Sequence, residues 1–209
     1  MSSPLAFEKS RPVVLLPHQA GWAGEFAEIA RRLRAAVGAA GVRIDHIGST
    51  AVPGLCAKDV IDVQLMVADL TSVGGLTHPL WQAGYRRGVR FEHDVFHPLP
   101  AHSPELRKLY MREPAGERRA HIHIREAGRL NARYALLFRD YLRANAPART
   151  EYELVKRCAA QLFPDSIAGY LFLKEPVFHL IYHAATLWAE KVGWQALISP
   201  DYHGAGTNP

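Results

Sequence analysis

Two polar side chains interrupt an otherwise apolar, β-branched run in the first half of the chain. The run covers residues 60–67 and carries Asp62 and Gln64 two positions apart. Because side chains alternate along a strand, both residues are expected on one face of a sheet. A buried carboxylate is costly unless it is paired or binds a metal. Asp62 and Gln64 are therefore candidate oxygen ligands of a divalent cation.

A glycine and two hydroxyl residues stand shortly before this run. Residues 42–46 alternate apolar and polar side chains, as a strand does, and the pattern breaks at Gly48, Ser49 and Thr50. A loop of this composition presents backbone N–H groups and a hydroxyl to phosphate oxygens. These three residues are candidate phosphate ligands. Lys58, between the loop and the apolar run, is a candidate counter-charge.

Two histidines occupy alternate positions in a later strand-like segment, residues 120–125. His121 and His123 are therefore expected on one face, where both can reach a common ion. Imidazole suits manganese, zinc or nickel better than magnesium. A histidine that titrates near neutrality can also act as a general base. We predict both histidines as metal ligands, His123 together with Asp62 as catalytic residues, and Arg112 as a phosphate partner.

Each of these residues also has a structural interpretation. A carboxylate at Asp62 could cap backbone groups or pair with an arginine, and the hydroxyls of Ser49 and Thr50 could bond to their own backbone in a turn. The two histidines could lie on a solvent-facing strand. The chain has 25 lysines and arginines, most of which are expected to be surface charges, so Arg112 is not distinguished by its type alone.

The segments around these residues predict a mixed α/β domain. Strands are expected over residues 12–16, 42–46, 60–67, 85–91, 109–112 and 120–125, and helices over 21–38 and 70–81. Because the order of strands and helices is mixed, the sheet is expected to be mixed as well.

Beyond Gly128 the pattern changes to long amphipathic helices. Their apolar faces fall in residues 130–142, 152–163 and 178–188, and Pro147, Pro164 and Pro176 are expected between the helices or at their starts. The expected organisation is one α/β (α+β) domain over residues 12–195, with a core over 12–128, a helical part over 129–195 and a flexible tail over 196–209.

Composition and charge narrow the function classes. No apolar stretch reaches the roughly 18 residues that a membrane-spanning helix needs, and the N-terminus has no secretory apolar core, so a cytoplasmic protein is expected. Cys56 and Cys158 lie far apart, which argues against a disulfide framework or a cysteine zinc site. The net charge of +5 favours an anionic ligand. A nucleic-acid partner ranks last, because no motif interleaves aromatic and basic residues.

Glycine and serine followed by a strand with an acidic residue is the core pattern of nucleotidyltransferases. Residues 43–55, followed by Lys58 and residues 60–63, resemble the signature block of the GrpB family. Other blocks that resemble the family are Leu16-Pro17 with Trp22, residues 121–123, residues 137–142 and residues 152–156. The resemblance extends from about residue 13 to about residue 178. It implies a nucleotidyltransferase-like mixed sheet flanked by helices, and a transferase activity.

Two positions depart from the wider nucleotidyltransferase pattern. Active members carry a second carboxylate two residues after the first, where this chain has Gln64. In place of a third acid on the neighbouring strand it has His121 and His123. Asp59 replaces the family's proline after the lysine and, three residues from Asp62, is expected on the opposite face. Magnesium chemistry with two metal ions is therefore less expected than a site for manganese, zinc or nickel.

These features predict a metal-dependent nucleotidyltransferase that moves a nucleotidyl group from a nucleoside triphosphate to an unknown acceptor. Gly48 and Ser49 would hold the triphosphate, Asp62 would hold a divalent cation (Mn, Zn, Ni or Mg), and Lys58 would neutralise developing charge. The alternative is a catalytically reduced module that binds a nucleotide, another anion or a metal without turnover. A nucleotide and an acceptor are the expected partners, and a membrane is not.

Overall fold

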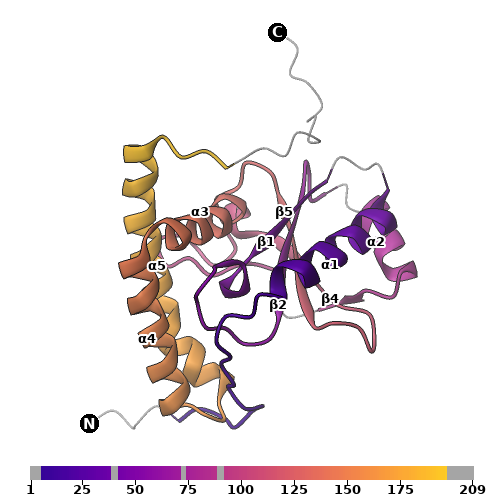
Figure 1. The fold of residues 1–209 in the computed structure, drawn as a ribbon. Helices are drawn as coiled ribbons and strands as arrows, with labels where there is room; N and C mark the ends of the chain where they lie inside the picture. Colours follow the sequence, from indigo (N-terminus) through magenta and orange to yellow (C-terminus); the bar gives the residue numbers. More distant parts are fainter. Residues whose placement is uncertain (1–5, 39–41, 72–73, 89–91, 197–209) are drawn as a thin grey trace.

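One mixed sheet with helices on both faces forms the centre of the molecule (Figure 1). The computed structural model describes residues 6–38, 42–71, 74–88 and 92–196, and within them the sheet has five strands. The elements follow the chain as α1 Trp22–Val37, β1 Arg43–Ile47, a 3-10 turn at Ser49–Ala51, β2 Ile61–Val67, α2 Gly74–Gln82, β3 Arg86–Arg87, a 3-10 turn at Pro104–Leu106, β4 Lys108–Arg112, β5 Ala120–Glu126, α3 Leu130–Ala144, α4 Ala146–Leu162 and α5 Ile167–Val192.

Strands β2 and β5 lie side by side in the sheet, whose strand order is β1-β2-β5-β4-β3. They run parallel to each other, while β1 is antiparallel to β2 and β4 is antiparallel to β5. The β-branched run at residues 61–67 takes an interior position because both of its faces are covered. The mixed sheet predicted from the sequence is confirmed.

The two faces of β2 and β5 differ in polarity. On one face Ile61, Val63 and Leu65 pack with Ile122 and Ile124 against the apolar sides of α1 and α2. The intervening residues of both strands, which include Asp62 and His121, face the opposite side. The period of two in the sequence therefore separates a hydrophobic core from a polar surface within the same strands.

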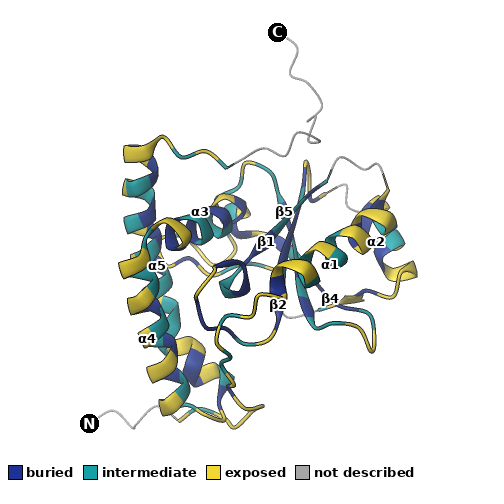
Figure 2. Ribbon diagram, in the orientation of Figure 1, coloured by how far each residue is buried: buried dark blue, intermediate teal, exposed yellow. Residues whose placement is uncertain are grey.

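Helices α3, α4 and α5 form a second layer with its own apolar core. Leu137 and Phe138 of α3 meet Tyr152 of α4 and Tyr182 of α5 in this core. Figure 2 shows the buried sides of these helices turned inward and the exposed sides turned outward. The layer is tied to the sheet because α3 contacts both β1 and β5.

Side-chain caps set the starts of the last two helices. The Asn145 side chain accepts a hydrogen bond from the Ala148 amide at the start of α4, and Ser166 accepts one from Gly169 at the start of α5. Helix α5 ends at Gly193, whose φ of 64° is the left-handed conformation that glycine adopts most readily.

Three expectations about the elements were wrong in detail. Residues 12–16 are not a strand of the sheet, because Leu16 makes only an isolated bridge to Ala57 while Val13 donates to the Pro164 carbonyl. Pro176 lies inside α5 and does not start a helix. The strand expected over residues 85–91 is limited to β3, and its residues 89–91 lie outside the described part of the chain.

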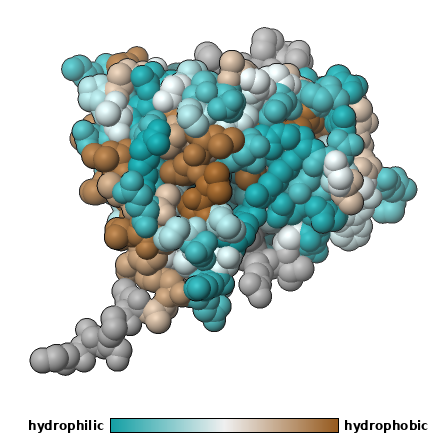
Figure 3. Space-filling model, turned by 60° about the horizontal axis from the view of Figure 1, so that its bottom comes forward, coloured by the Kyte–Doolittle hydropathy of each residue, from teal (hydrophilic) through white to brown (hydrophobic). Residues whose placement is uncertain are grey.

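Large apolar side chains are exposed on the outer sides of α4 and α5. They include Leu154, Leu162, Phe172, Leu180 and Leu187. On the face drawn in Figure 3, hydrophobic residues gather in the left and central part, and hydrophilic residues dominate the right part. In the described ranges no helix has the length and apolar character needed to cross a membrane. The expected tail over residues 196–209 lies, from residue 197 on, outside those ranges.

Candidate active site

The parallel pairing of β2 and β5 brings one carboxylate against two imidazoles. Asp62 is the register partner of His121, and Gln64 is the partner of His123. His121 Nδ1 lies 3.1 Å from Asp62 Oδ1, and His123 Nε2 lies 3.8 Å from the same oxygen. One ligand atom from each of Asp62, His121 and His123 lies within 4.8 Å of the others. The structure thus gathers a carboxylate and two imidazoles that could share one divalent cation.

Burial and hydrogen bonding set the charges in this cluster. Burial opposes ionisation of Asp62, yet the hydrogen bonds from His121 and His123 hold the pKa of its carboxyl far below the usual range. Burial lowers the pKa of His123 to about 4, so its ring is neutral at pH 7. Within the described residues the buried His123 Nδ1 has no hydrogen-bond partner. The ring nitrogen that faces the Asp62 carboxylate is Nε2, and a neutral imidazole can bind a metal ion through such a nitrogen.

Gly48 lets the backbone after β1 pass directly over Asp62. Its φ of 70° and ψ of −170° lie in a region that is essentially restricted to glycine. A Cβ atom at this position would lie 2.4 Å from Asp62 Oδ2, so a side chain would displace the carboxylate. Ser49 follows at the start of the 3-10 turn and is half-buried. The predicted phosphate loop and the predicted metal ligand are therefore in direct contact.

Two arginines of α3 hold this loop in place. Arg139 Nη1 donates to the His46 carbonyl at 2.9 Å, and Arg143 Nε donates to the Ala51 carbonyl at 2.9 Å. Asp140 accepts hydrogen bonds from both arginines. The C-terminal helices thus contribute to the geometry of the site as well as to the second core.

Thr50 has a structural place in the loop. Its hydroxyl is buried, lies 3.0 Å from His46 Nε2 and donates to the Val60 carbonyl at 3.5 Å. These contacts join the end of β1 to the start of β2. The structure therefore places the predicted phosphate-binding hydroxyl of Thr50 among protein partners on the inner side of the loop.

Gln64 is placed beside the cluster with its amide fully engaged. Its Oε1 accepts from Arg125 Nη1 at 2.8 Å, and its Nε2 donates to the Ala132 carbonyl at 3.2 Å. The side chain has no exposed surface. The amide that the sequence predicted as a metal ligand instead connects β2 to β5 and α3. The same arginine also pairs with Asp94.

Arg112 also has a protein partner. It lies opposite His121 in the β4–β5 register, but its Nε and Nη2 donate to the two oxygens of Glu113 at 3.0 Å each. Such a bidentate pair neutralises the guanidinium. The predicted phosphate contact of Arg112 is therefore not preformed.

Lys58 lies near the cluster together with lysines that the sequence did not single out. Its Nζ is 5.2 Å from the centre of the Tyr170 ring. Lys156 and Lys174 are the additional lysines, and the negative charge of Asp62 acts to raise the pKa of both. The sequence contains a pattern that could have identified them. Each lysine stands four residues after a tyrosine, Lys156 after Tyr152 and Lys174 after Tyr170, so each pair shares one face of its helix.

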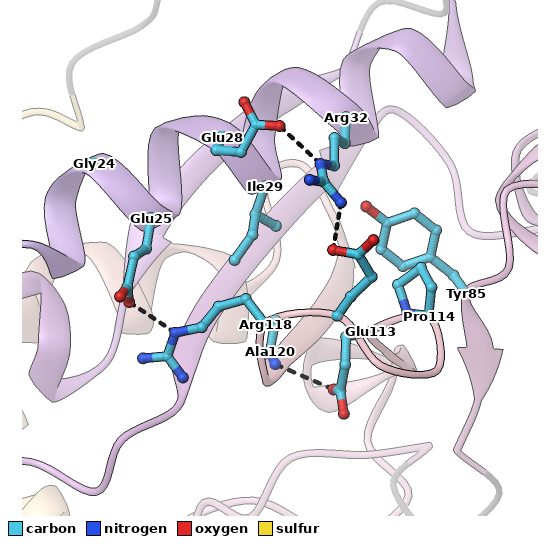
Figure 4. A pocket seen from close by; sticks show the side chains of 11 residues that line it. Gly24, Glu25, Glu28, Ile29, Arg32, Tyr85, Glu113, Pro114, Arg118 and Ala120 are labelled. Atoms are coloured by element: carbon cyan, nitrogen blue, oxygen red, sulfur yellow. Dashed lines mark hydrogen bonds and ion pairs between the residues drawn. The ribbon is translucent and has the colours of Figure 1, made fainter.

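A cavity of about 460 Å³ lies elsewhere, between α1 and the segment that connects β4 to β5 (Figure 4). Its charged side chains pair with one another: Arg118 bonds to Glu25, and Arg32 bonds to Glu28 and Glu117. Helix α1 covers the sheet face opposite to the one that carries Asp62. The cavity is therefore separate from the Asp62 cluster.

Comparison with known proteins gives the family of this chain. Residues 12–184 match the family described as GrpB protein. A dephospho-CoA kinase of Mycolicibacterium paratuberculosis is 38% identical over 198 residues, which cover 88% of this chain and 48% of that protein. The UPF0157 protein SCO7215 of Streptomyces coelicolor is 40% identical over 143 residues, 68% of each chain. This chain thus spans about half the length of the first of these relatives.

A solved structure agrees with the sequence relationship. The crystal structure of conserved protein GrpB from Enterococcus faecalis matches with a TM-score of 0.67 and 28% identity, over 84% of this chain and 99% of that chain. The described residues have the α/β architecture expected from the sequence, with a mixed five-stranded sheet between helices. On these matches and on the architecture that they share, the chain belongs to the GrpB family.

Proposed function

We propose that this protein binds a nucleoside triphosphate with a divalent cation and transfers its nucleotidyl group to an acceptor. The observation that carries the proposal is the placement of Asp62, His121 and His123 within one ligand sphere directly under the Gly48 backbone. An anionic oxygen with two nitrogen donors fits manganese, zinc or nickel better than magnesium. His123 turns its Nε2 toward Asp62 Oδ1 at 3.8 Å, and its neutral ring agrees with this donor set.

The residues of the chain would divide the work as follows. Asp62, His121 and His123 hold the cation, which supplies Lewis-acid polarisation of the phosphate when it is bound. The N–H groups and hydroxyl of Gly48 and Ser49 bind phosphate oxygens. Lys58 offsets negative charge that develops during the reaction. An acceptor oxygen would form a bond to the α-phosphorus, and pyrophosphate would leave as the bond between the α- and β-phosphates breaks.

The acceptor's proton needs a base in this scheme. His121 or His123 would accept this proton wherever the ring does not bind the cation. Burial lowers the pKa of the His123 ring to about 4, which leaves the ring neutral at pH 7 but makes it a weak base. The alternative function is binding of the metal–nucleotide complex without transfer. The engagement of Gln64 by Arg125 and Ala132 favours that alternative, since it occupies the amide oxygen and leaves Asp62 as the one oxygen ligand of the cluster.

Calorimetric titration with Mn²⁺ and each nucleoside triphosphate tests the binding part of the proposal. Asp62→Asn keeps the side-chain volume but removes the charge, so metal-dependent nucleotide affinity should fall about 100-fold or more. Glu151→Gln removes one exposed negative charge on α4 and is the matched control. Equal affinity of the native protein and Asp62→Asn in the presence of Mn²⁺ would refute the proposed role of the cluster.

Pyrophosphate release decides between transfer and simple binding. Water and dephospho-CoA are suitable first acceptors, the second because of the name carried by the longer relatives. The transferase predicts release that depends on both Mn²⁺ and Asp62. Tight nucleotide binding with no release for any acceptor would favour the binding module.

A further inference from the structure

Three lysines from separate parts of the chain meet on the helical side of the Asp62 cluster. Lys58 precedes β2, Lys156 belongs to α4 and Lys174 belongs to α5. Lys58 Nζ and Lys174 Nζ lie 5.2 and 5.4 Å from the centre of the Tyr170 ring, so the same ring joins them. Lys156 donates to the Cys56 carbonyl, two residues before Lys58. The lysine cluster is defined here as Lys58, Lys156 and Lys174.

The lysine cluster has no directly paired carboxylate within the described residues. Among the residues that the structure describes, none of the three forms an ion pair within 4 Å, whereas Lys108 is paired with Asp94 on the same sheet. They contact the Cys56 carbonyl and aromatic rings. Lys156 is only 2% exposed, so water does not replace its missing counter-charge, while Lys58 and Lys174 are half-buried. A positive cluster withdrawn from water to this extent is costly unless an anion completes it.

The pKa values of the three lysines are lowered, as expected for cations that are withdrawn from water. Burial lowers the pKa of Lys174 to about 7 and that of Lys156 to about 8, and it also lowers the pKa of Lys58. Repulsion among the lysines adds to the effect on Lys174. The acidic groups that act in the opposite direction are Asp62, Glu153 and Glu175. They do not restore ordinary pKa values.

The cluster is continuous with the phosphate loop. The centre of the Tyr152 ring lies 5.5 Å from Lys156 Nζ. Tyr152 is 1% exposed, and its hydroxyl has no hydrogen-bond partner among the described residues. The Ser49 hydroxyl lies close enough to act on the pKa of Tyr152, against the larger effect of burial. Asp62 acts on all three lysines. Hydroxyl and ammonium groups therefore extend from Ser49 in the phosphate loop, through Tyr152, to the lysine cluster.

We propose that the lysine cluster binds the terminal phosphates of a polyphosphate, and that in a bound nucleoside triphosphate it holds the β- and γ-phosphates while the α-phosphate lies at Asp62. The second half of this statement rests on the proposed function, and the first half does not. Three ammonium groups match the charge of a terminal diphosphate. A nucleic-acid backbone fits less well, because Lys156 is only 2% exposed and offers little surface to a long polyanion.

Titration of the full chain with inorganic tripolyphosphate, without metal, tests the cluster by itself. Replacing Lys174 or Lys156 with Gln should weaken binding about 10- to 100-fold, as expected for loss of one charge-assisted contact. Lys174→Arg keeps the charge and should retain most of the affinity. Lys191→Gln, at the exposed end of α5, is the matched control and should bind like the native protein.

Proton uptake gives a second readout that needs no variant. At pH 8 part of Lys174 and Lys156 is neutral, and a bound anion favours their charged forms, so binding should take up protons. At pH 6 both lysines are already charged and their uptake should vanish. Calorimetry in two buffers with different ionisation enthalpies measures the difference. If Lys156→Gln fails to fold, this measurement and Lys174→Gln still decide the question.

The outcomes separate this proposal from the proposed function. Tripolyphosphate binding that depends on Lys174, in a protein that shows no metal-dependent nucleotide binding, would support the lysine cluster and refute the nucleotidyl site. Metal-dependent nucleotide binding that is unchanged in Lys174→Gln, with no tripolyphosphate binding, would overturn the lysine proposal alone. Equal tripolyphosphate binding by the native protein and both Gln variants would overturn it as well.

Discussion

At the scale of single residues, the site depends on how closely Gly48 and Asp62 approach each other. The Asp62 side chain occupies the space that a Cβ atom at Gly48 would need, and Ile47, the residue before Gly48, is the register partner of Asp62. The carboxylate is thereby fixed between a backbone segment on one side and His121 on the other. A substitution at Gly48 is therefore expected to move the Asp62 carboxylate without replacing any of the predicted metal ligands.

Replacing Gly48 with Ala should both destabilise the fold and impair the site. The backbone conformation alone costs about 1–3 kcal/mol for a residue with a Cβ, and the clash with Asp62 Oδ2 at 2.4 Å adds to it. Gly38→Ala is the control, because Gly38 has a similar conformation (φ 64°, ψ −148°) and open space around its Cβ position.

Thermal unfolding and Mn²⁺ titration of both variants measure the two effects. Gly38→Ala should lose stability while its metal affinity stays native. Gly48→Ala should lose more stability and bind Mn²⁺ more weakly. Native metal affinity in a folded Gly48→Ala protein would show that the close approach to Asp62 does not position the carboxylate.

The lowered pKa of His46 should make the free energy of unfolding decrease in mild acid. Burial lowers the pKa of its ring to about 4 from 6.5, so between these pH values the unfolded chain binds a proton that the folded protein does not. Stability should therefore decrease as the pH falls from about 6.5 to about 4. A shift of this size corresponds to roughly 3 kcal/mol for this group.

Denaturant unfolding at several pH values compares the native protein with His46→Gln, which keeps a polar group near Thr50. The variant should lose less stability on acidification. His78→Gln, at an exposed position on α2, should follow the native curve. Parallel curves for the native protein and His46→Gln would contradict a lowered pKa at His46.

At the scale of elements, the start of α5 is fitted closely to the end of α4. A Cβ at Gly169 would lie 2.3 Å from the Phe163 ring, the residue that follows α4. This packing sets the direction in which α5 leaves the turn. Since Tyr170 and Lys174 follow in the first two turns of α5, the same contact positions the lysine cluster.

Replacing glycine with alanine at the same position of two helices should change the free energy of unfolding in opposite directions. Gly169 is the third residue of α5, and Gly24 is the third residue of α1. Gly169→Ala should destabilise the protein by about 1–3 kcal/mol through overpacking against Phe163. Gly24→Ala meets nothing within 4 Å and should stabilise it by roughly 0.5–1 kcal/mol through helix propensity. Chemical denaturation measures both, and the same sign for the two variants would contradict this account.

At the scale of the whole molecule, a buried polar network joins the sheet to the helical layer. Asp94 is held by Lys108 of β4, Arg125 of β5 and Asn131 of α3. Although burial opposes its ionisation, the two cations hold the pKa of Asp94 well below the usual range. Removing one member of such a network leaves an unpaired buried charge. The two cores on either side of the sheet are therefore expected to depend on each other.

We expect residues 12–195 to unfold as one unit. Trp22 reports on the core between α1 and the sheet, and Trp188 packs on Tyr141 in the helical core. In proteins that retain a fluorescence probe only at Trp22 or only at Trp188, denaturant midpoints should coincide, as for a two-state transition. Separate midpoints would show that the helical layer is an independent domain.

The sequence by itself determined the features that depend on local periodicity. Alternation placed Asp62 with Gln64 and His121 with His123 on single faces of their strands, and the helical period located α1 between residues 21 and 38. Those features follow from neighbouring residues, because the direction of a side chain along a strand or helix is fixed by backbone geometry.

Tertiary structure alone decided which polar groups remain available. Gln64 is bound by Arg125 and Arg112 by Glu113, while Lys156 and Lys174 form no ion pair with a carboxylate of the described residues. Pro176 is accommodated within α5. Each outcome depends on partners brought together by packing between sheet and helices, some of them up to 100 residues apart in the chain. No periodicity encodes such pairings, since they arise from the competition of all buried groups for partners as the layers close.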